Sequence, residues 1–245
     1  MVQNIFKGIK AYASALGLIS TLGLWKYFAV PVLISFITAS LIGLSAWSWS
    51  DNIANTIDLL WIWEWGADWF HGFAEILGGI LIIILGLIVY KHIVMALSAP
   101  FISPVSTAIE RHFLGDKHIH RNTSNTSQLW RGIRINVRNL TMEIFITIPL
   151  LILSLVPVLN IVTTVLLFLV QAYYAGFGNM DYTLERHYGY KESVGFVKRH
   201  KGVAIGNGII FTIMLFIPVI GVLMVLPLSV TAATSQTIKF IQDKK

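Results

Sequence analysis

The chain of 245 residues contains no cysteine and few charged residues. The absence of cysteine excludes disulfides, thiol catalysis and cysteine-based metal sites. Charged residues make up only 12% of the chain, whereas soluble domains carry about 25%. Hydrophobic residues make up 56%. This composition predicts an integral membrane protein.

Lysine and arginine are also absent from one long window, since all 18 of them lie outside residues 27–90. An uncharged run at 27–50 is long enough to span a bilayer, and 76–101 is a second long apolar run. Six of the eight tryptophans lie in or just before the intervening segment, 51–75. Because tryptophan favours the headgroup boundary, we expect two transmembrane helices joined by an external, Trp-rich segment.

The distribution of basic residues also predicts the orientation. Lysine and arginine favour the cytoplasmic side of a membrane. We therefore expect the N-terminus, the loops at 103–141 and 179–202, and the C-terminus to be cytoplasmic. The formal net charge of +6 fits loops that face anionic lipid headgroups, and it gives no reason to expect nucleic acid binding.

The N-terminal segment, 3–22, carries apolar side chains at helical spacing: Ile5, Ile9, Tyr12, Leu16 and Ile19. Lys7 and Lys10 fall on other sides of the helix. The pattern predicts an amphipathic helix that lies on the membrane surface.

Two apolar stretches in the second half, 142–178 and 203–236, are each broken once near the middle. The breaks are at Pro157 and Pro218, and proline ends a helix. The arm before each break has 15 residues, or about 22 Å of helix, against a hydrocarbon core of about 30 Å. We therefore predict two re-entrant helical hairpins.

The two hairpins resemble a repeat. A shift of 61 residues places Pro157 on Pro218 and Arg138 on Arg199. Repeated elements often build a transport path in a membrane. Chance recurrence of proline and a basic flank in an apolar chain is an equal alternative.

The segment between the second span and the first hairpin, 103–141, is polar. Ser103-Pro104 predicts a helix start, followed by Ile109, Glu110 and Phe113 at helical spacing. A basic stripe on one helix face follows at spacings of three and four: Arg131, Arg134 and Arg138. Such a stripe serves either lipid headgroups or an anion pathway.

Catalytic motifs are missing. The sequence has no nucleophile elbow, phosphate loop or HExxH motif, so we expect neither an enzyme nor a cofactor. Three loop histidines, His112, His118 and His120, are more typical of solvated side chains than of a metal site. Polar residues inside the hairpins either line a pathway or brace the helices: Glu143, Asn160, Gln171 and Asn207.

One local pattern suggests an anion site, at Gly23, Leu24, Trp25 and Lys26. It lies where one helix ends and a membrane helix begins, so free N–H groups point at the ligand position. Gly23 permits a close approach and Lys26 adds a positive charge. A plain linker with a snorkelling lysine gives the same pattern.

Several segments in order resemble one family. They are Gly23-Leu24 with Lys26-Tyr27 before Pro31, Ala99-Pro100-Phe101 leading to Ile109-Glu110, Asp181 to Arg186, Tyr190, Glu192 and Arg199-His200. Together with the length, they resemble the CysZ-type sulfate permease family, which includes an etoposide-induced membrane protein of the endoplasmic reticulum. The resemblance implies two long transmembrane helices, two hemi-penetrating hairpins, a homo-oligomer and sulfate uptake for cysteine synthesis.

The resemblance also shows departures at the anion site. A Gly-Leu-Arg-Arg-like segment of the family appears here as Gly23-Leu24-Trp25-Lys26. Lysine binds an oxyanion only as a point charge, whereas arginine is a planar bidentate donor. An Arg-Glu pair appears as Ile135-Asn136, and a carboxylate before Glu110 as Thr107.

The sequence therefore predicts an all-α inner-membrane protein that forms a single membrane domain. We expect passive or proton-coupled passage of sulfate or a similar oxyanion into the cytoplasm, with capture at Gly23, Leu24 and Lys26. Glu110 would pair with a basic residue on the cytoplasmic side. Three arginines would attract the anion: Arg134, Arg138 and Arg199. The alternative is a membrane scaffold or lipid-interacting protein without transport.

Overall fold

The computed structural model describes residues 1–58, 66–115, 124–154, 156–217 and 220–242. In these ranges every regular element is a helix. The α-helices are α1 (Val2–Thr21), α2 (Ala29–Asp58), α3 (Ala67–Leu97), α4 (Ala99–Leu114), α5 (Asn125–Ser154), α6 (Pro157–His187), α7 (Tyr190–Arg199), α8 (Lys201–Leu215) and α9 (Ile220–Gln242), with a 3-10 helix, η1 (Leu24–Phe28), before α2.

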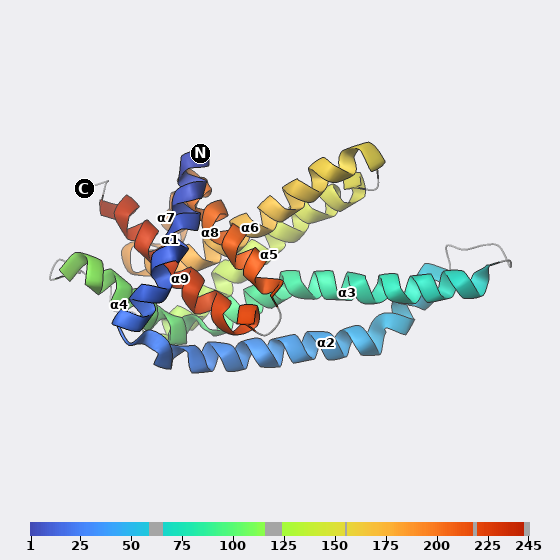
Figure 1. Ribbon diagram of the computed structural model, residues 1–245, viewed down its shortest axis with the longest axis horizontal. Helices are drawn as coiled ribbons and strands as arrows, with labels where there is room; N and C mark the ends of the chain where they lie inside the picture. Colours follow the sequence, from blue (N-terminus) through green and yellow to red (C-terminus); the bar gives the residue numbers. More distant parts are fainter. Residues whose placement is uncertain (59–65, 116–123, 155, 218–219, 243–245) are drawn as a thin grey trace.

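The helices form two arms that project from one body (Figure 1). α2 and α3 run side by side as the longer arm, and α5 and α6 form a second arm that diverges from it. The other helices pack into the body, which also holds both chain termini. The tips of the two arms therefore lie at the end of the molecule away from the termini (Figure 1).

Three helical stretches are long and apolar enough to cross a membrane: Leu24–Trp49, Asn125–Ser154 and Val158–His187. A bent pair, Leu85–Leu97 with Ala99–Leu114, meets the same test at an angle of 70°. The all-helical, multi-pass prediction is confirmed at this level. The predicted external segment 51–75 is partly helical at both ends, and residues 59–65 lie outside the described residues.

The arm length predicted for the first hairpin is wrong. α5 has 30 residues, because the polar helix and the apolar arm from residue 142 are one continuous element. A proline inside it, Pro149, does not end the helix. Helix length therefore does not distinguish re-entry from full crossing here. In the second hairpin α8 does have 15 residues, and Pro218 lies outside the described residues.

The boundary between the second span and the next helix also differs from the prediction. The chain bends at Ser98, and α4 begins at Ala99 with Pro100 in its first turn. Proline fits there because the first helical N–H groups have no acceptor within the helix. Ser103 is thus a buried residue within α4 and not a cap, and Pro104 lies inside the helix.

The N-terminal helix packs on the body by a face that lies beside the predicted apolar face and shares Ile19 with it. The buried residues of α1 form a stripe of mostly small side chains, Gly8, Ala11, Ala15 and Ile19. This stripe lies against α8 and α9. Leu16, predicted on the apolar face, is 49% exposed. Small residues allow the closer helix packing, so they take the protein-facing side.

The two predicted repeats pack against each other through α6 and α8. A shift of 61 residues places the end of α5, Ser154, on the end of α8, Leu215. At the crossing, a Cβ on Gly208 would lie 1.7 Å from the Ala172 carbonyl oxygen. Asn179 Nδ2 donates to Asn207 Oδ1 at 2.8 Å across the same interface. The hairpins are thus joined by close backbone contact and a buried amide pair.

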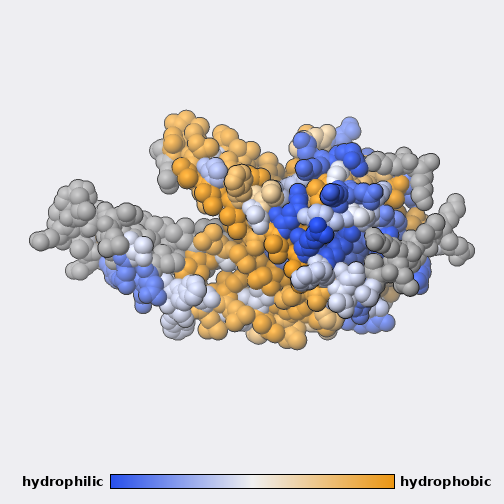
Figure 2. Space-filling view, turned by 180° about the vertical axis from the view of Figure 1, so that it is seen from behind, coloured by the Kyte–Doolittle hydropathy of each residue, from blue (hydrophilic) through white to orange (hydrophobic). Residues whose placement is uncertain are grey.

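The surface divides along the long axis (Figure 2). Apolar side chains cover the α5–α6 arm and the middle of the molecule, and hydrophilic side chains gather over the body. On the arm, Phe145 is 76% exposed and Ile161 78%. Exposed apolar side chains of this kind are suited to contact with lipid.

Candidate functional site

The predicted capture segment forms a sharp corner between α1 and α2. Gly23 has φ 63° and ψ 35°, a left-handed conformation that favours glycine. Leu24 is buried, whereas Trp25 and Lys26 are exposed. The Lys26 Nζ lies 5.3 Å from the centre of the Tyr27 ring. The corner therefore presents one flexible cation beside the first N–H groups of a helix.

The carboxylate of Glu110 is fully buried in the body on α4. Arg186 Nε donates to Glu110 Oε2 at 2.8 Å, and His187 Nε2 bonds Oε1. Arg186 also donates to Ser106 Oγ and to the Tyr182 carbonyl oxygen, both at 2.7 Å. Glu110 does pair with basic residues, and each nitrogen of the Arg186 guanidinium has an acceptor. We call Glu110, Arg186 and His187 the Glu110 cluster.

A group of hydroxyls surrounds this cluster. Ser106 Oγ lies 3.0 Å from Thr183 Oγ1 and 2.9 Å from Thr234 Oγ1. A neighbouring bond runs from Ser103 Oγ to Glu185 Oε1 at 2.8 Å. These contacts join α4, α6 and α9 through buried polar groups.

A second ion pair, partly buried, connects α5 to α6. Arg131 donates to both oxygens of Asp181, at 3.0 and 2.8 Å. It also donates to Ser193 Oγ and to the Tyr188 carbonyl oxygen. Bidentate pairing fixes a guanidinium in place, so Arg131 ties α5 and α6 to the start of α7.

A third ionic group lies where α3 meets α5. Lys91 Nζ lies 2.6 Å from Glu143 Oε1, and His92 Nε2 lies 2.9 Å from Glu143 Oε2. All three side chains are at most 2% exposed. Lys91 also donates to the Gln171 carbonyl oxygen at 3.3 Å. We call Lys91, His92 and Glu143 the Glu143 cluster.

The predicted basic stripe on α5 is divided among different partners. The guanidinium of Arg134 stacks on the Tyr190 ring at 4.0 Å, and that of Arg138 lies 5.2 Å from the Phe177 ring centre. Arg138 also donates to Asn139 Oδ1. Stacking of this kind leaves some guanidinium donors open to an anion.

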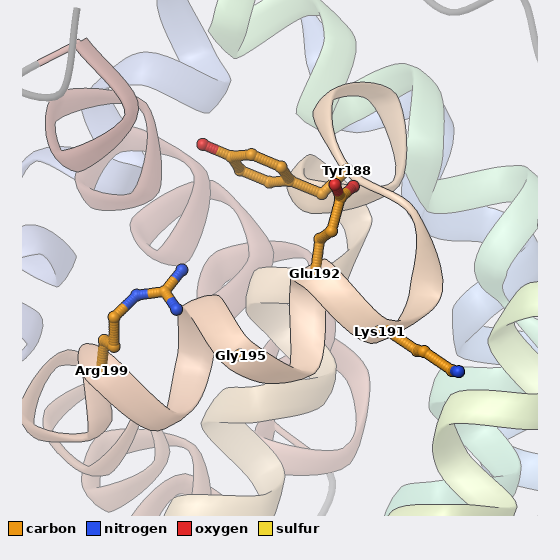
Figure 3. A pocket seen from close by; sticks show the side chains of 5 residues that line it. All are labelled: Tyr188, Lys191, Glu192, Gly195 and Arg199. Carbon is orange, nitrogen blue, oxygen red and sulfur yellow. The ribbon is translucent and has the colours of Figure 1, made fainter.

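Arg199 lines a hollow of about 340 Å³ on α7. The other lining residues are Tyr188, Lys191, Glu192 and Gly195. Arg199 and Tyr188 project over the same side of α7, whereas Lys191 points away from Arg199 (Figure 3). Glu192 accepts a hydrogen bond from the Gly189 N–H and so holds the start of α7.

Two polar residues predicted inside the hairpins, Asn160 and Asn207, have bracing contacts. Asn160 Nδ2 donates to the Ser154 carbonyl oxygen at 3.1 Å, which closes the turn opened by Pro157. Tyr12 donates to the Asn207 carbonyl oxygen and lies 2.6 Å from Ser229 Oγ. Burial raises the pKa of Tyr12, so this phenol stays neutral.

Sequence reasoning missed the partners of the buried carboxylates. Five of these residues received no role from the sequence: Asp181, Arg186, His187, Lys91 and His92. Glu143 and its partners are about 50 positions apart. The signal available was a Lys-His pair inside an apolar run, because such residues are costly without partners.

The described residues contain no group of three or more side chains suited to a metal ion. His112 lies against Phe113 with ring centres 5.4 Å apart. The other two histidines of the predicted loop trio, His118 and His120, lie outside the described residues.

Long apolar helices around buried ionic clusters define a multi-pass membrane protein. A family model described as Sulfate transporter CysZ/Etoposide-induced protein 2.4 matches residues 11–225. The chain belongs to this family, which confirms the resemblance. The family is of transporter type and is not an enzyme family. A search of curated protein sequences found no match.

Proposed function

We propose that this protein admits sulfate or a similar oxyanion to the cytoplasm. The observation that carries the proposal is the set of buried and partly buried ionic groups among apolar helices, formed by Arg131–Asp181 and the Glu110 and Glu143 clusters. Ionisable residues inside a membrane protein are costly and typically mark an ion pathway. The family description, which names a sulfate transporter, supports sulfate as the cargo.

In this proposal the anion is captured at the corner formed by Gly23, Leu24, Trp25 and Lys26. The N–H groups at the start of η1 and the ammonium of Lys26 would neutralise part of its charge. Arg134, Arg138 and Arg199 would raise the local anion concentration on the cytoplasmic side. The imported sulfate would feed cysteine synthesis.

The proposed topology places both termini and the hydrophilic surface of the body on the cytoplasmic side of the inner membrane. α2 and α3 are the two spanning helices, and the α5–α6 and α8–α9 pairs are hairpins that enter and return. The basic residues outside 27–90 support this orientation, since they favour the cytoplasm. The exposed apolar face of the α5–α6 arm would contact lipid or a second copy in a homo-oligomer.

The test is uptake of radiolabelled sulfate into liposomes that contain the purified protein. Lys26→Ala should lower the flux by about tenfold, because a contact to a charged donor contributes roughly 1.5 kcal/mol. Lys26→Arg should raise it, since arginine restores a planar bidentate donor. Lys10→Ala removes an exposed lysine from α1 and is the matched control. Equal flux in all four proteins would refute capture at this corner.

A membrane scaffold or lipid-interacting protein is the second candidate. It is favoured by the pairing of an exposed tryptophan, Trp25, with Lys26 at one corner, a combination that anchors proteins at headgroups. Lys26→Ala would then weaken binding to anionic lipid, measured by co-purified lipid, while liposomes show no protein-dependent sulfate flux.

A further inference from the structure

The Glu143 cluster contains more donors than its single carboxylate needs. Lys91 and His92 are adjacent on α3, and both bond Glu143 on α5. The carboxylate itself is fully buried. The Glu143 carboxylate lies between Lys91 Nζ and His92 Nε2, with one of its oxygens bonded to each. A free oxyanion would take the same position between these two donors.

The hydrogen bonds fix the proton count of this cluster. Asn136 Nδ2 donates to the Gly132 carbonyl oxygen, so its Oδ1 accepts from His92 Nδ1 at 3.2 Å. A second proton must then lie between His92 Nε2 and Glu143 Oε2. The imidazole and carboxyl together are therefore neutral, and the positive charge of Lys91 is left over.

Further positive and donor groups lie close along α5. The Arg138 guanidinium donates to Asn139 Oδ1 at 2.9 Å. Asn139 and Thr147 lie one helical turn before and after Glu143 on the same buried face. Among the described residues, Asn139 Nδ2 and Thr147 Oγ1 are buried without a hydrogen-bond partner. Buried donors without acceptors are costly, so their presence points to a ligand.

We infer that Lys91, His92 and Asn139 form an oxyanion-binding site, and that Glu143 occupies it as a tethered anion which the cargo displaces. With the shared proton on His92, the two cations match the double charge of sulfate. The inference deepens the proposed function, because it assigns the site that the anion reaches after capture near Lys26. It concerns residues on other helices and can fail separately.

The experiment compares sulfate binding by the purified chain and its Glu143→Gln variant, using calorimetry in detergent. Both carry Lys26→Ala, so that capture at the corner does not contribute. Glutamine keeps the shape of the side chain and removes the competing charge. Sulfate affinity should rise by about tenfold or more, because a tethered competitor acts at a high effective concentration. Adding Lys91→Met should abolish this gain.

The matched control is Glu75→Gln, which removes an exposed carboxylate from α3 and should leave sulfate affinity unchanged. Unchanged or weaker binding by a folded Glu143→Gln variant would overturn the inference. If that variant is unstable, sulfate should raise its melting temperature more than that of the parent chain, since a ligand stabilises the state that binds it. If it does not fold even with sulfate present, sulfate binding is measured instead on the Lys91→Met/Glu143→Gln double variant, in which both charged side chains are replaced by uncharged ones. Loss of sulfate binding relative to the parent then supports the site, and equal binding overturns it.

The two proposals give different patterns of results. Sulfate flux that depends on Lys26, together with no affinity gain in Glu143→Gln, would keep the proposed function and reject the inference. An affinity gain in Glu143→Gln without sulfate flux in liposomes would keep the anion site and reject sulfate permeation.

Discussion

The Glu110 and Glu143 clusters are built alike and differ in how completely they are bonded. In each, a buried glutamate is held by a basic residue and by the histidine that follows it directly: Arg186 and His187 for Glu110, Lys91 and His92 for Glu143. The same pair of contacts thus occurs once between α4 and α6 and once between α3 and α5.

The cation is what separates them. The planar guanidinium of Arg186 donates to Glu110, Ser106 and the Tyr182 carbonyl oxygen at the same time. Lys91 is a point charge that bonds Glu143 and the Gln171 carbonyl oxygen. Among the described residues, two buried donors that flank Glu143 on α5, Asn139 Nδ2 and Thr147 Oγ1, have no hydrogen-bond partner. A saturated cluster is suited to bracing helices, and an unsaturated one is suited to exchanging its anion.

The largest expected difference is in stability. Arg186→Met should cost about 3–5 kcal/mol, because it leaves a buried carboxylate without its main partner. Lys91→Met should cost less, about 1–3 kcal/mol, since Lys91 bonds Glu143 and one carbonyl oxygen, whereas Arg186 also holds Ser106 and the Tyr182 carbonyl oxygen. Unfolding in mixed micelles measures both. Equal costs would show that the two clusters brace the fold to the same extent.

Sulfate affinity should change more at the Glu143 cluster, whereas stability should change more at the Glu110 cluster. Glu110→Gln should not strengthen sulfate binding, because Ser106 and the Tyr182 carbonyl oxygen still hold Arg186. Glu143→Gln should strengthen it by about tenfold. Calorimetry on the two variants side by side makes the comparison, and a gain in Glu110→Gln as large as that in Glu143→Gln would remove the distinction.

The smallest effect is expected from isosteric threonine replacements. Thr183→Val removes the hydrogen bond to Thr234 Oγ1, which belongs to the set of hydroxyls around Ser106, and should cost about 1 kcal/mol. Thr147→Val removes a hydroxyl that has no partner among the described residues, so stability should stay level or rise. Thermal unfolding in detergent measures both. A larger loss for Thr147→Val would mean that this hydroxyl is already bonded, for instance to water.

Local sequence patterns predicted several elements closely. The N-terminal helix expected at 3–22 is Val2–Thr21, and the turn expected at Pro157 is where α6 begins. Gly23 was expected at a corner before a membrane helix, and its backbone is left-handed there. These features depend on neighbouring residues alone, namely on apolar spacing, a missing N–H or a missing Cβ.

Other features depended on packing that no local pattern encodes. The face of α1 that contacts the body is set by close approach to α8 and α9, so small residues outrank the larger apolar ones. The helix after the second span begins at Ala99 and not at Ser103. The chain bends at Ser98, so Pro100 lies in the first turn and Pro104 lies inside the helix.

By itself the sequence determined that this chain is a helical membrane protein, where its basic residues concentrate and which family it belongs to. Composition and periodicity suffice for the helical membrane class, because a long apolar helix satisfies its own backbone hydrogen bonds in lipid. The family followed from the resemblance of several short segments in order. Only the tertiary structure decided which charges meet. Glu143 bonds Lys91, which is 52 positions away in the sequence, and Glu110 bonds Arg186, which is 76 positions away. Burial makes an unpaired charge costly in any position, but the partner is chosen by helix packing.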